Sequence, residues 1–375
     1  MKSKKYHKIL ITGGAGFIGS FLADQLISLG YKVRILDNLE DQVHKDVKPE
    51  YLNKQAQFIK GDIRNYYELQ KAIKEIDAVF HLAAAVGVTQ SNYQIKKYVD
   101  TNTGGVANLL DILVNTKNKV KKLITISSMT GYGEGNYSCR RCGVVRPSLR
   151  NQKQLRGKEW NLYCPNCHNQ IVPVPTDEKA LDYPNSVYGL SKKFQQDLSF
   201  LIGNVYNIPV VVLRGFNIYG PRQSLSNPYT GVTAIFISRL KNNKEAVVFE
   251  DGLQTRDFVS VHDVVEAFVL SLEKSEADHQ MFNIGSGRGT PILEIAKTIS
   301  KLMDKKGPIK VNNEFRKNDI RHCFADISKA REILGWQPKI GLEEGFKELV
   351  DWSMTQQAED KFSQARKELE QKDLI

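Results

Sequence analysis

Ser128, Tyr188 and Lys192 carry side chains that suit proton transfer at an alcohol carbon. Tyr188 and Lys192 lie four positions apart in a predicted helix, so they share one helical face. The lysine charge favours a phenolate, and we expect it to lower the pKa of Tyr188 toward the working range. Ser128 ends a predicted strand and can hydrogen-bond the same substrate oxygen. Because a Tyr-x-x-x-Lys pair occurs by chance in many helices, its meaning depends on the rest of the chain.

A glycine-rich loop follows the first apolar run. Gly13, Gly16 and Gly19 open a predicted helix, where the bare backbone can approach a pyrophosphate at the helix N-terminus. Asp37 ends the second predicted strand, 24 residues after Gly13. A carboxylate there accepts hydrogen bonds from an adenosine ribose and repels a 2′-phosphate, which favours NAD over NADP. The alternative is that Asp37 is a turn residue before Asn38.

Six apolar runs rich in β-branched residues predict the strands that position these groups. They cover residues 8–12, 31–37, 57–62, 78–82, 122–127 and 209–214. Helical patterns separate them, which predicts an α/β fold with a Rossmann-type doubly wound parallel sheet. Asp62 follows the third strand, where it can reach adenine. Small residues after the fourth strand leave room for the cofactor, whereas we expect His81 to be packed.

Four cysteines interrupt this rhythm. Cys139, Cys142, Cys164 and Cys167 form two Cys-x-x-Cys pairs that 21 residues separate. This spacing is typical of a structural zinc site, because each pair turns two thiolates toward one point. Two redox-active dithiols are the alternative. Cys323 makes the count odd, and we expect no export signal, so a disulfide framework is disfavoured.

These patterns predict five segments. An NAD-binding domain covers residues 1–135 and resumes at 173–218 with the helix that carries Tyr188 and Lys192. Residues 136–172 form an inserted zinc ribbon. Residues 219–354 form a smaller substrate-binding lobe. Residues 355–375 are almost entirely polar, which predicts a solvent-exposed terminal helix.

The composition, 41% hydrophobic and 25% charged residues, is that of a globular protein. No apolar run reaches the ~20 residues that cross a bilayer, and the first apolar run is too short for a signal peptide. We therefore expect a cytoplasmic protein without a membrane partner. The net charge is +11. Because the lysines are scattered and no arginine-rich run alternates with aromatic residues, we expect an anionic substrate rather than nucleic acid.

Taken together, the chain resembles the extended short-chain dehydrogenase/reductase family of nucleotide-sugar epimerases and dehydratases. The resemblance rests on Gly13–Gly19, Asp37, Asp62, Leu82–Ala85, Asn102, Ser127–Ser128, Tyr132–Gly133, Tyr188–Lys192, Asn217–Pro221, Arg256–Val259 and Asn283–Gly287. It implies cofactor contacts from Gly13, Gly16, Phe17, Ile18, Asp37, Asn38, Asp62, Ile63, Leu82, Ala83, Ala84, Asn102, Tyr188 and Lys192. It implies substrate contacts from Ser128, Asn217, Arg256 and Arg321, with the arginines on a diphosphate. It also implies a homodimer through the helices beside Tyr188.

The residues after Ser128 bear on the reaction. Dehydratases of the resembling family carry an Asp-Glu pair there, whereas this chain has Met129 and Thr130. Because methionine cannot transfer a proton, 4,6-dehydration is disfavoured, and reversible oxidation at C4 remains, which is 4-epimerisation with NAD regenerated in each cycle.

Residues 85–91, residues 223–231 and the cysteine segment resemble the 4-epimerases that convert dTDP-L-rhamnose to dTDP-6-deoxy-L-talose. The alternatives are a UDP-hexose 4-epimerase, an NAD-dependent nucleotide-sugar reductase or decarboxylase, and a non-catalytic NAD-sensing scaffold. The intact Ser128, Tyr188 and Lys192 argue against the scaffold. The insertion lies between Ser128 and Tyr188, so we expect it to emerge beside the sugar site as a lid or a dimer contact.

Overall fold

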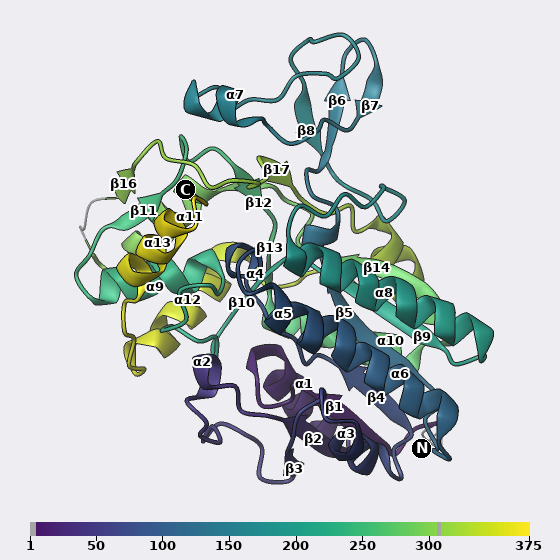
Figure 1. Cartoon of the computed structure of the whole chain (residues 1–375). Helices are drawn as coiled ribbons and strands as arrows, with labels where there is room; N and C mark the ends of the chain where they lie inside the picture. Colours follow the sequence, from purple (N-terminus) through teal and green to yellow (C-terminus); the bar gives the residue numbers. More distant parts are fainter. Residues whose placement is uncertain (1–4, 306–308) are drawn as a thin grey trace.

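The computed structural model describes residues 5–305 and 309–375. Within these residues, seven parallel strands form one sheet (Figure 1). Their order across the sheet is β14 (Gln280–Ile284), β9 (Val210–Gly215), β5 (Leu123–Ser128), β4 (Ala78–His81), β1 (Lys8–Thr12), β2 (Lys32–Asp37) and β3 (Gln57–Lys60). Six of the strands and the doubly wound parallel sheet confirm the prediction from sequence. β14 is an addition, because its run is short and contains Gln280 and Asn283.

Helices cover both faces of the sheet because its strands are apolar on both sides. The helices are α1 (Phe17–Ser28), α3 (Tyr66–Ile73), α6 (Gly105–Asn115), α8 (Val187–Val205) and α10 (Val261–Glu273). Ile9 and Ile11 of β1 pack in one core with α1 and α10. Leu10, between them, points into a second core with α3 and α6. Shorter helical segments follow the strands at α2 (Asp41–His44), α4 (Val88–Ser91), α5 (Ile95–Tyr98), Val99–Gly104 and Met129–Gly131.

A second group of elements has its own apolar core, in which Phe236, Ile295 and Phe346 are buried. Its helices are α9 (Val232–Lys241), α11 (Ile292–Leu302), α12 (Leu342–Met354) and α13 (Phe362–Gln371). Two short helical turns, at Ser275–Ala277 and Ala330–Leu334, pack against the core of the main sheet instead. Its strands form small sheets from β10 (Asn217–Tyr219) with β13 (Phe258–Ser260), β11 (Ala246–Val248) with β16 (Ile309–Val311), and β12 (Thr255–Arg256) with β15 (Thr290–Pro291) and β17 (His322–Cys323).

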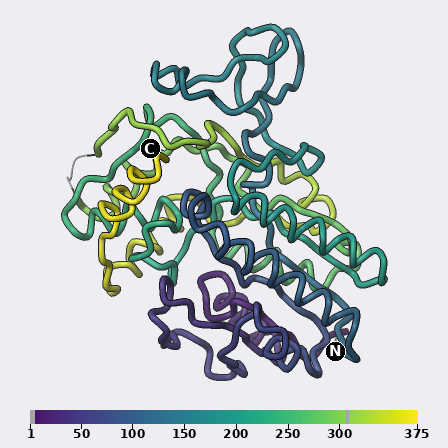
Figure 2. The backbone as a smooth tube through the Cα atoms, in the orientation of Figure 1, coloured from purple at the N-terminus to yellow at the C-terminus, as the bar shows by residue number. Residues whose placement is uncertain are grey.

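The cysteine segment folds into a small unit that projects from the body (Figure 2). It contains an antiparallel sheet of β7 (Gly143–Val145), β6 (Asn136–Cys139) and β8 (Val172–Val174). The helix α7 (Gln152–Arg156) lies between β7 and β8 in the sequence. Its core contains few apolar side chains, among them Tyr137, Leu162 and Ile171. A core of this size is too small to hold a fold of this length without additional cross-links.

The C-terminal helix α13 differs from the expectation of a solvent-exposed helix. Ala365 and Leu369 are buried, and the helix packs beside α9 (Figure 1). Its polar composition concealed a narrow apolar stripe. Among the described residues, none of the helices has the length and apolar character that crossing a bilayer requires.

Candidate active site

One cavity of about 600 Å³ extends from the glycine loop to helix α13. Gly13, Asp37 and Ser128 lie at or just after the carboxyl ends of β1, β2 and β5, where ligands bind in open α/β sheets. The predicted cofactor residues that line it are Gly13, Gly16, Phe17, Ile18, Asp37, Asn38, Asp62, Ile63, Leu82, Ala83, Ala84, Tyr188 and Lys192. The cavity therefore brings most of the predicted site together.

The glycine loop has the geometry that a dinucleotide needs. Gly13 has φ +71°, and a Cβ atom there would lie 2.7 Å from the backbone of Ala83. Helix α1 begins after Gly16 without a side-chain cap, so its first N–H groups are free to bind an anion. Asp37 accepts hydrogen bonds from the backbone N–H groups of Ala15 (3.0 Å) and Leu39 (2.9 Å). These contacts hold its carboxylate against the cavity, where its remaining lone pairs can accept from ribose hydroxyls.

Asn102 takes a different place from the one expected. It is fully buried and is not among the described residues that line the cavity. Its amide oxygen accepts from the Ala85 N–H (2.7 Å), and its amide nitrogen donates to the Ala85 carbonyl (3.1 Å) and to Ser191 Oγ (2.9 Å). Asn102 thus ties the loop after β4 to helix α8, behind the predicted cofactor surface.

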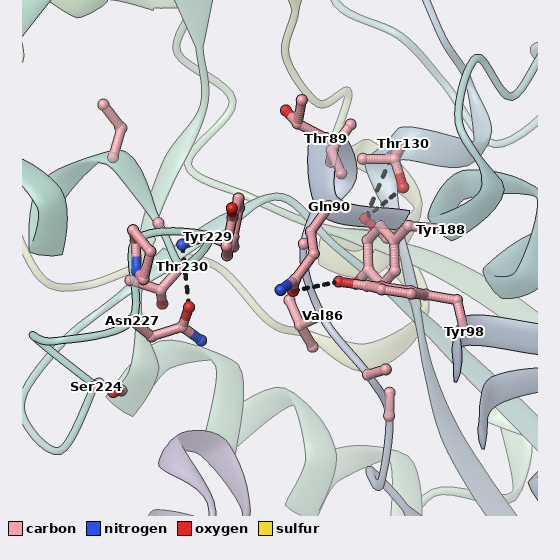
Figure 3. A pocket seen from close by; sticks show the side chains of 18 of the residues that line it. Val86, Thr89, Gln90, Tyr98, Thr130, Tyr188, Ser224, Asn227, Tyr229 and Thr230 are labelled. Atoms are coloured by element: carbon pink, nitrogen blue, oxygen red, sulfur yellow. Dashed lines mark hydrogen bonds between the residues drawn. The ribbon is translucent and has the colours of Figure 1, made fainter. Parts of the chain in front are cut away.

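The predicted catalytic residues line one part of the cavity. Ser128 ends β5, and Thr130 Oγ1 donates to its hydroxyl (3.0 Å), as Figure 3 shows beside Tyr188. The Tyr188 ring meets that of Tyr98 edge to face, with centroids 6.3 Å apart. Ser91 Oγ accepts the Tyr188 backbone N–H (2.9 Å), which fixes the start of α8. The phenol is therefore held by neighbours from three segments.

The pKa values in this part differ from the prediction. Burial raises the pKa of Tyr188 to about 12, although its hydrogen bond with Ser128 opposes the rise. Burial lowers the pKa of Lys192 to about 7. Lys192 Nζ donates to Gln195 Oε1 (2.7 Å), so its charge is not directed at the phenol. The expected lowering of the tyrosine pKa is therefore wrong for the protein's own side chains.

His81 is buried and packed, as expected. Its Nδ1 lies 2.8 Å from Thr12 Oγ1, and burial lowers the pKa of its imidazole to about 3. It therefore stays neutral and positions the end of β1.

Polar groups continue beyond the phenol. Asn217 lines the cavity, and its buried side-chain oxygen has no hydrogen-bond partner within the described part of the chain. Arg256 lines the cavity too, and its guanidinium donates to Asp319 Oδ1 (3.0 Å). Arg316, which sequence reasoning missed, joins it through Asp319 Oδ2 (2.6 Å). Burial alone would raise the pKa of Asp319, but the charges of Arg316 and Arg256 lower it to about 2.

Arg321 does not take the predicted role. It is 1% exposed and is not among the described residues that line the cavity. Its guanidinium donates to Asp251 (2.6 and 2.7 Å) and to Glu250 (2.9 Å). Its charge is neutralised inside the fold, and Arg316 is the arginine that shares Asp319 with Arg256 at the cavity.

The cavity also contains residues that sequence reasoning did not single out. Figure 3 shows Gln90 and Tyr98 near Tyr188, with Asn227 and Tyr229 across the pocket. They lie in or near the segments 85–91 and 223–231, whose resemblance to known epimerases was the available signal. The α13 residues that line the cavity are Phe362, Ala365, Arg366 and Leu369.

Glu368 of α13 joins three segments at the cavity. Its carboxylate accepts from the hydroxyls of Tyr93 (2.9 Å) and Tyr229 (2.6 Å). Asn92, next to Tyr93, accepts the backbone N–H of Val187 at the start of α8 (3.1 Å). Helix α13 is therefore connected to the helix that carries Tyr188.

The four predicted metal ligands lie together in the insertion. All four sulfur atoms of Cys139, Cys142, Cys164 and Cys167 are within 4.8 Å of one another. Within residues 5–305 and 309–375, the lining of the cavity contains no residue of segment 136–172, so the expected lid is not seen.

Comparisons with known proteins identify relatives over almost the whole chain. Residues 9–147 match the model of the NAD dependent epimerase/dehydratase family, and residues 169–349 match that of GDP-mannose 4,6 dehydratase. The dTDP-L-rhamnose 4-epimerase of Burkholderia thailandensis is 35% identical over 92% of this chain and 94% of its own.

Two solved structures are similar throughout. The UDP-glucose 4-epimerase of Thermotoga maritima with UDP-glucose has a TM-score of 0.76 and 33% identity, over 92% of this chain and 98% of that one. The UDP-glucuronic acid 4-epimerase of Bacillus cereus, in complex with UDP-glucuronic acid and NAD, has a TM-score of 0.74 and 29% identity, over 92% and 98%.

Proposed function

Because the chain belongs to the NAD dependent epimerase/dehydratase family, we propose that it inverts C4 of a nucleoside-diphosphate sugar. The observation that carries this proposal is that three sets of groups line one cavity. They are the glycine loop with Asp37, Ser128 with Tyr188, and Arg256 with Arg316. A sugar placed at Tyr188 then has its diphosphate at the arginines, which suit phosphate oxygens through paired N–H donors.

The side chains divide the work at C4. When bound, NAD supplies reversible hydride acceptance at the sugar carbon. Tyr188 takes the C4 hydroxyl proton and later returns it, while Ser128 hydrogen-bonds the same oxygen. Asn217, with its free buried acceptor, orients a sugar hydroxyl. Lys192 stabilises the phenolate once its ammonium turns from Gln195 toward the phenol.

The neighbours of Ser128 favour epimerisation over dehydration. Met129 is buried and carries no group that transfers a proton. Thr130 donates to Ser128 and is not acidic. Elimination of water from C5 and C6 needs an acid and a base at that place. The match of residues 169–349 to a dehydratase model lies outside these two positions.

The substrate that we propose is dTDP-L-rhamnose, converted to dTDP-6-deoxy-L-talose. The similarity to the B. thailandensis enzyme supports it, and the apolar side chains beyond the arginines, such as Phe249 and Leu369, suit a pyrimidine base. A UDP-hexose is the second candidate, which the similarity to the T. maritima enzyme favours.

Incubation with dTDP-L-rhamnose, UDP-glucose and UDP-galactose, followed by NMR of the sugar, tests the proposal. We expect C4 inversion of dTDP-L-rhamnose without net NADH formation. Inversion of a UDP-hexose alone would select the second candidate. A reductase would accumulate oxidised or reduced product with NAD turnover, and a decarboxylase would release CO₂. Failure to invert any of the three would contradict the proposal.

We also propose that the four insertion cysteines bind one structural zinc ion. Zn–S bonds of about 2.3 Å in a tetrahedron place sulfurs about 3.8 Å apart, and Cys139 and Cys167 are 3.5 Å apart. Each Cys-x-x-Cys pair is followed by a residue in the left-handed region, Gly143 (φ +74°) and His168 (φ +58°). Both pairs therefore turn in the same way toward one point. A four-cysteine set leaves no open position, so the role is structural.

Elemental analysis of the purified protein should find about one zinc per chain. Cys164→Ser should lose the metal and lower the melting temperature, because the small core of the insertion depends on it. Cys323→Ala is the matched control, since this buried cysteine lies in β17 outside the cluster, and it should keep the metal. Less than a tenth of a zinc per chain would contradict the site.

We propose that two copies of the chain associate through α8. Leu190, Phe194, Leu201 and Val205 are exposed apolar residues that recur at helical spacing on one face. Leu201→Asp should shift the molar mass measured by light scattering from dimer toward monomer. Leu253→Asp, an exposed leucine far from α8 in sequence, should leave the mass unchanged. A monomeric wild-type protein would contradict the proposal.

A further inference from the structure

The buried side chain of Arg150 makes one of the contacts between the insertion and the body of the protein. Its guanidinium is 1% exposed and forms a paired contact with the Glu250 carboxylate (2.7 and 2.9 Å). It also donates to the backbone carbonyl of Asp319 (3.1 Å). A paired arginine–carboxylate contact fixes the relative orientation of the two side chains and also pairs their charges. The insertion is therefore joined rigidly to the segment that begins at Asp319.

The same segment holds Arg256 and Arg316, two of the cationic residues that line the cavity. Arg256 donates to the carbonyls of Ile320 (2.7 Å) and Arg321 (3.1 Å) and to the Asp319 carboxylate. Arg316 donates to the other oxygen of that carboxylate. Arg150 and Arg256 thus bind consecutive carbonyls of one stretch of backbone. A shift of that backbone would move both Arg256 and Arg316.

The root of the insertion holds the same stretch at a second place. Glu134 accepts from the backbone N–H groups of Arg321 (2.8 Å) and His322 (2.7 Å). Tyr137 of β6 donates to the same carboxylate (2.6 Å). Two independent contacts from the insertion and its root therefore fix residues 319–322.

The Glu250 carboxylate is held from two sides. Arg150 on one side and Arg321 on the other bind it. The backbone of Glu250 lies in a turn, with φ +53°. The carboxylate that pairs with Arg150 is therefore itself fixed to the body of the protein.

We propose that the insertion braces the substrate site, with Arg150 as the positioning residue that fixes segment 319–322 and thereby Arg256 and Arg316. This inference rests on the proposed nucleoside-diphosphate sugar, because it assigns those arginines to the diphosphate. It gives the cysteine segment a role in substrate binding although it contributes no cavity wall.

Arg150→Met tests the proposal, with dTDP and UDP as probes in calorimetry on the full chain. The dissociation constant of the tighter-binding nucleotide should rise roughly tenfold, since residues in one ion-pair network couple by this much. KM for the nucleotide sugar should rise in parallel, with kcat changed by less than about twofold. Bound NAD should be unchanged. Arg140→Met, an exposed arginine of the same insertion, is the matched control and should match wild type.

A double variant distinguishes the loss of the contact to Asp319 from the effects of an unbalanced charge and of lowered stability. Arg150→Met with Glu250→Gln leaves no unpaired carboxylate but still removes the donor to Asp319, so the dissociation constant should stay raised. Wild-type nucleotide binding in either variant, even with a lowered melting temperature, would mean that Arg150 has only a structural role. That result would overturn the inference and leave the proposed function standing. Wild-type protein that binds neither nucleotide would overturn the inference together with the proposed function.

Discussion

Tyr188→Phe is expected to lower kcat for C4 inversion by roughly a thousandfold, the scale of a lost general acid–base group. The Tyr188 phenol hydrogen-bonds Ser128 and can both accept and return the hydroxyl proton. Phenylalanine keeps the ring and its edge-to-face contact with Tyr98, so the fold should be retained. Product formation by NMR and the NAD content of the purified variant give the two readouts. NAD content should equal that of wild type.

Tyr98→Phe is the control that the same cavity offers. Its hydroxyl donates to Gln90 (3.1 Å) and is fixed by that bond rather than aimed at Ser128. This variant removes the same atom from an adjacent ring, so its kcat should stay within about tenfold of wild type. Equal losses in the two variants would mean that hydroxyl packing, and not proton transfer, accounts for the effect. Full activity of Tyr188→Phe would refute the catalytic assignment.

The sheet and its binding edge could be predicted from the sequence because both follow from local patterns. The period of the apolar runs located β1 through β5, and parallel strands bring their carboxyl ends to one edge. Residues such as Gly13, Asp37 and Ser128 lie at or just after those ends. Their place in one cavity could therefore be predicted without knowing how distant parts of the chain fold. Tyr188 and Lys192 joined them because helical spacing places them on one face.

Side-chain direction in irregular segments could not be predicted in this way. Arg316 and Arg321 are five positions apart in a stretch without a period, so the sequence does not distinguish which of them faces the cavity. The acids that decide the outcome, Glu250 and Asp251, lie about seventy positions earlier in the chain. The direction of the Asn102 side chain could not be predicted either, because its hydrogen-bond partners, Ala85 and Ser191, are distant in the sequence.

The sequence of helix α13 contains an amphipathic pattern, but the polar composition of the segment obscured it. Phe362, Ala365 and Leu369 recur at spacings of three and four, which is the pattern of a helix with one buried face. The surrounding lysines and glutamates made the segment look fully solvated. Its contact with the cavity also depends on Tyr93 and Tyr229, which no local pattern connects to it.

Arg256→Met and Arg316→Met should each raise KM for the nucleotide sugar between roughly tenfold and a hundredfold. Hydrogen bonds to charged groups contribute about 1.5–3 kcal/mol, and 1.4 kcal/mol is a factor of about ten in binding. The diphosphate is remote from C4 and carries the same charge before and during hydride transfer. The loss should therefore appear mainly in KM rather than in kcat. Each variant leaves Asp319 one arginine partner, so its carboxylate is not buried unpaired.

Steady-state kinetics and the affinity for dTDP or UDP alone should agree in these variants, because both measure the same phosphate contacts. Arg288→Met is the matched control, since this exposed arginine pairs with Glu294 at the surface and should keep wild-type KM. NAD content should not change in any of the three, because Arg256 and Arg316 lie at the far end of the cavity from the glycine loop. A variant of Arg256 or Arg316 with unchanged KM would place the diphosphate elsewhere.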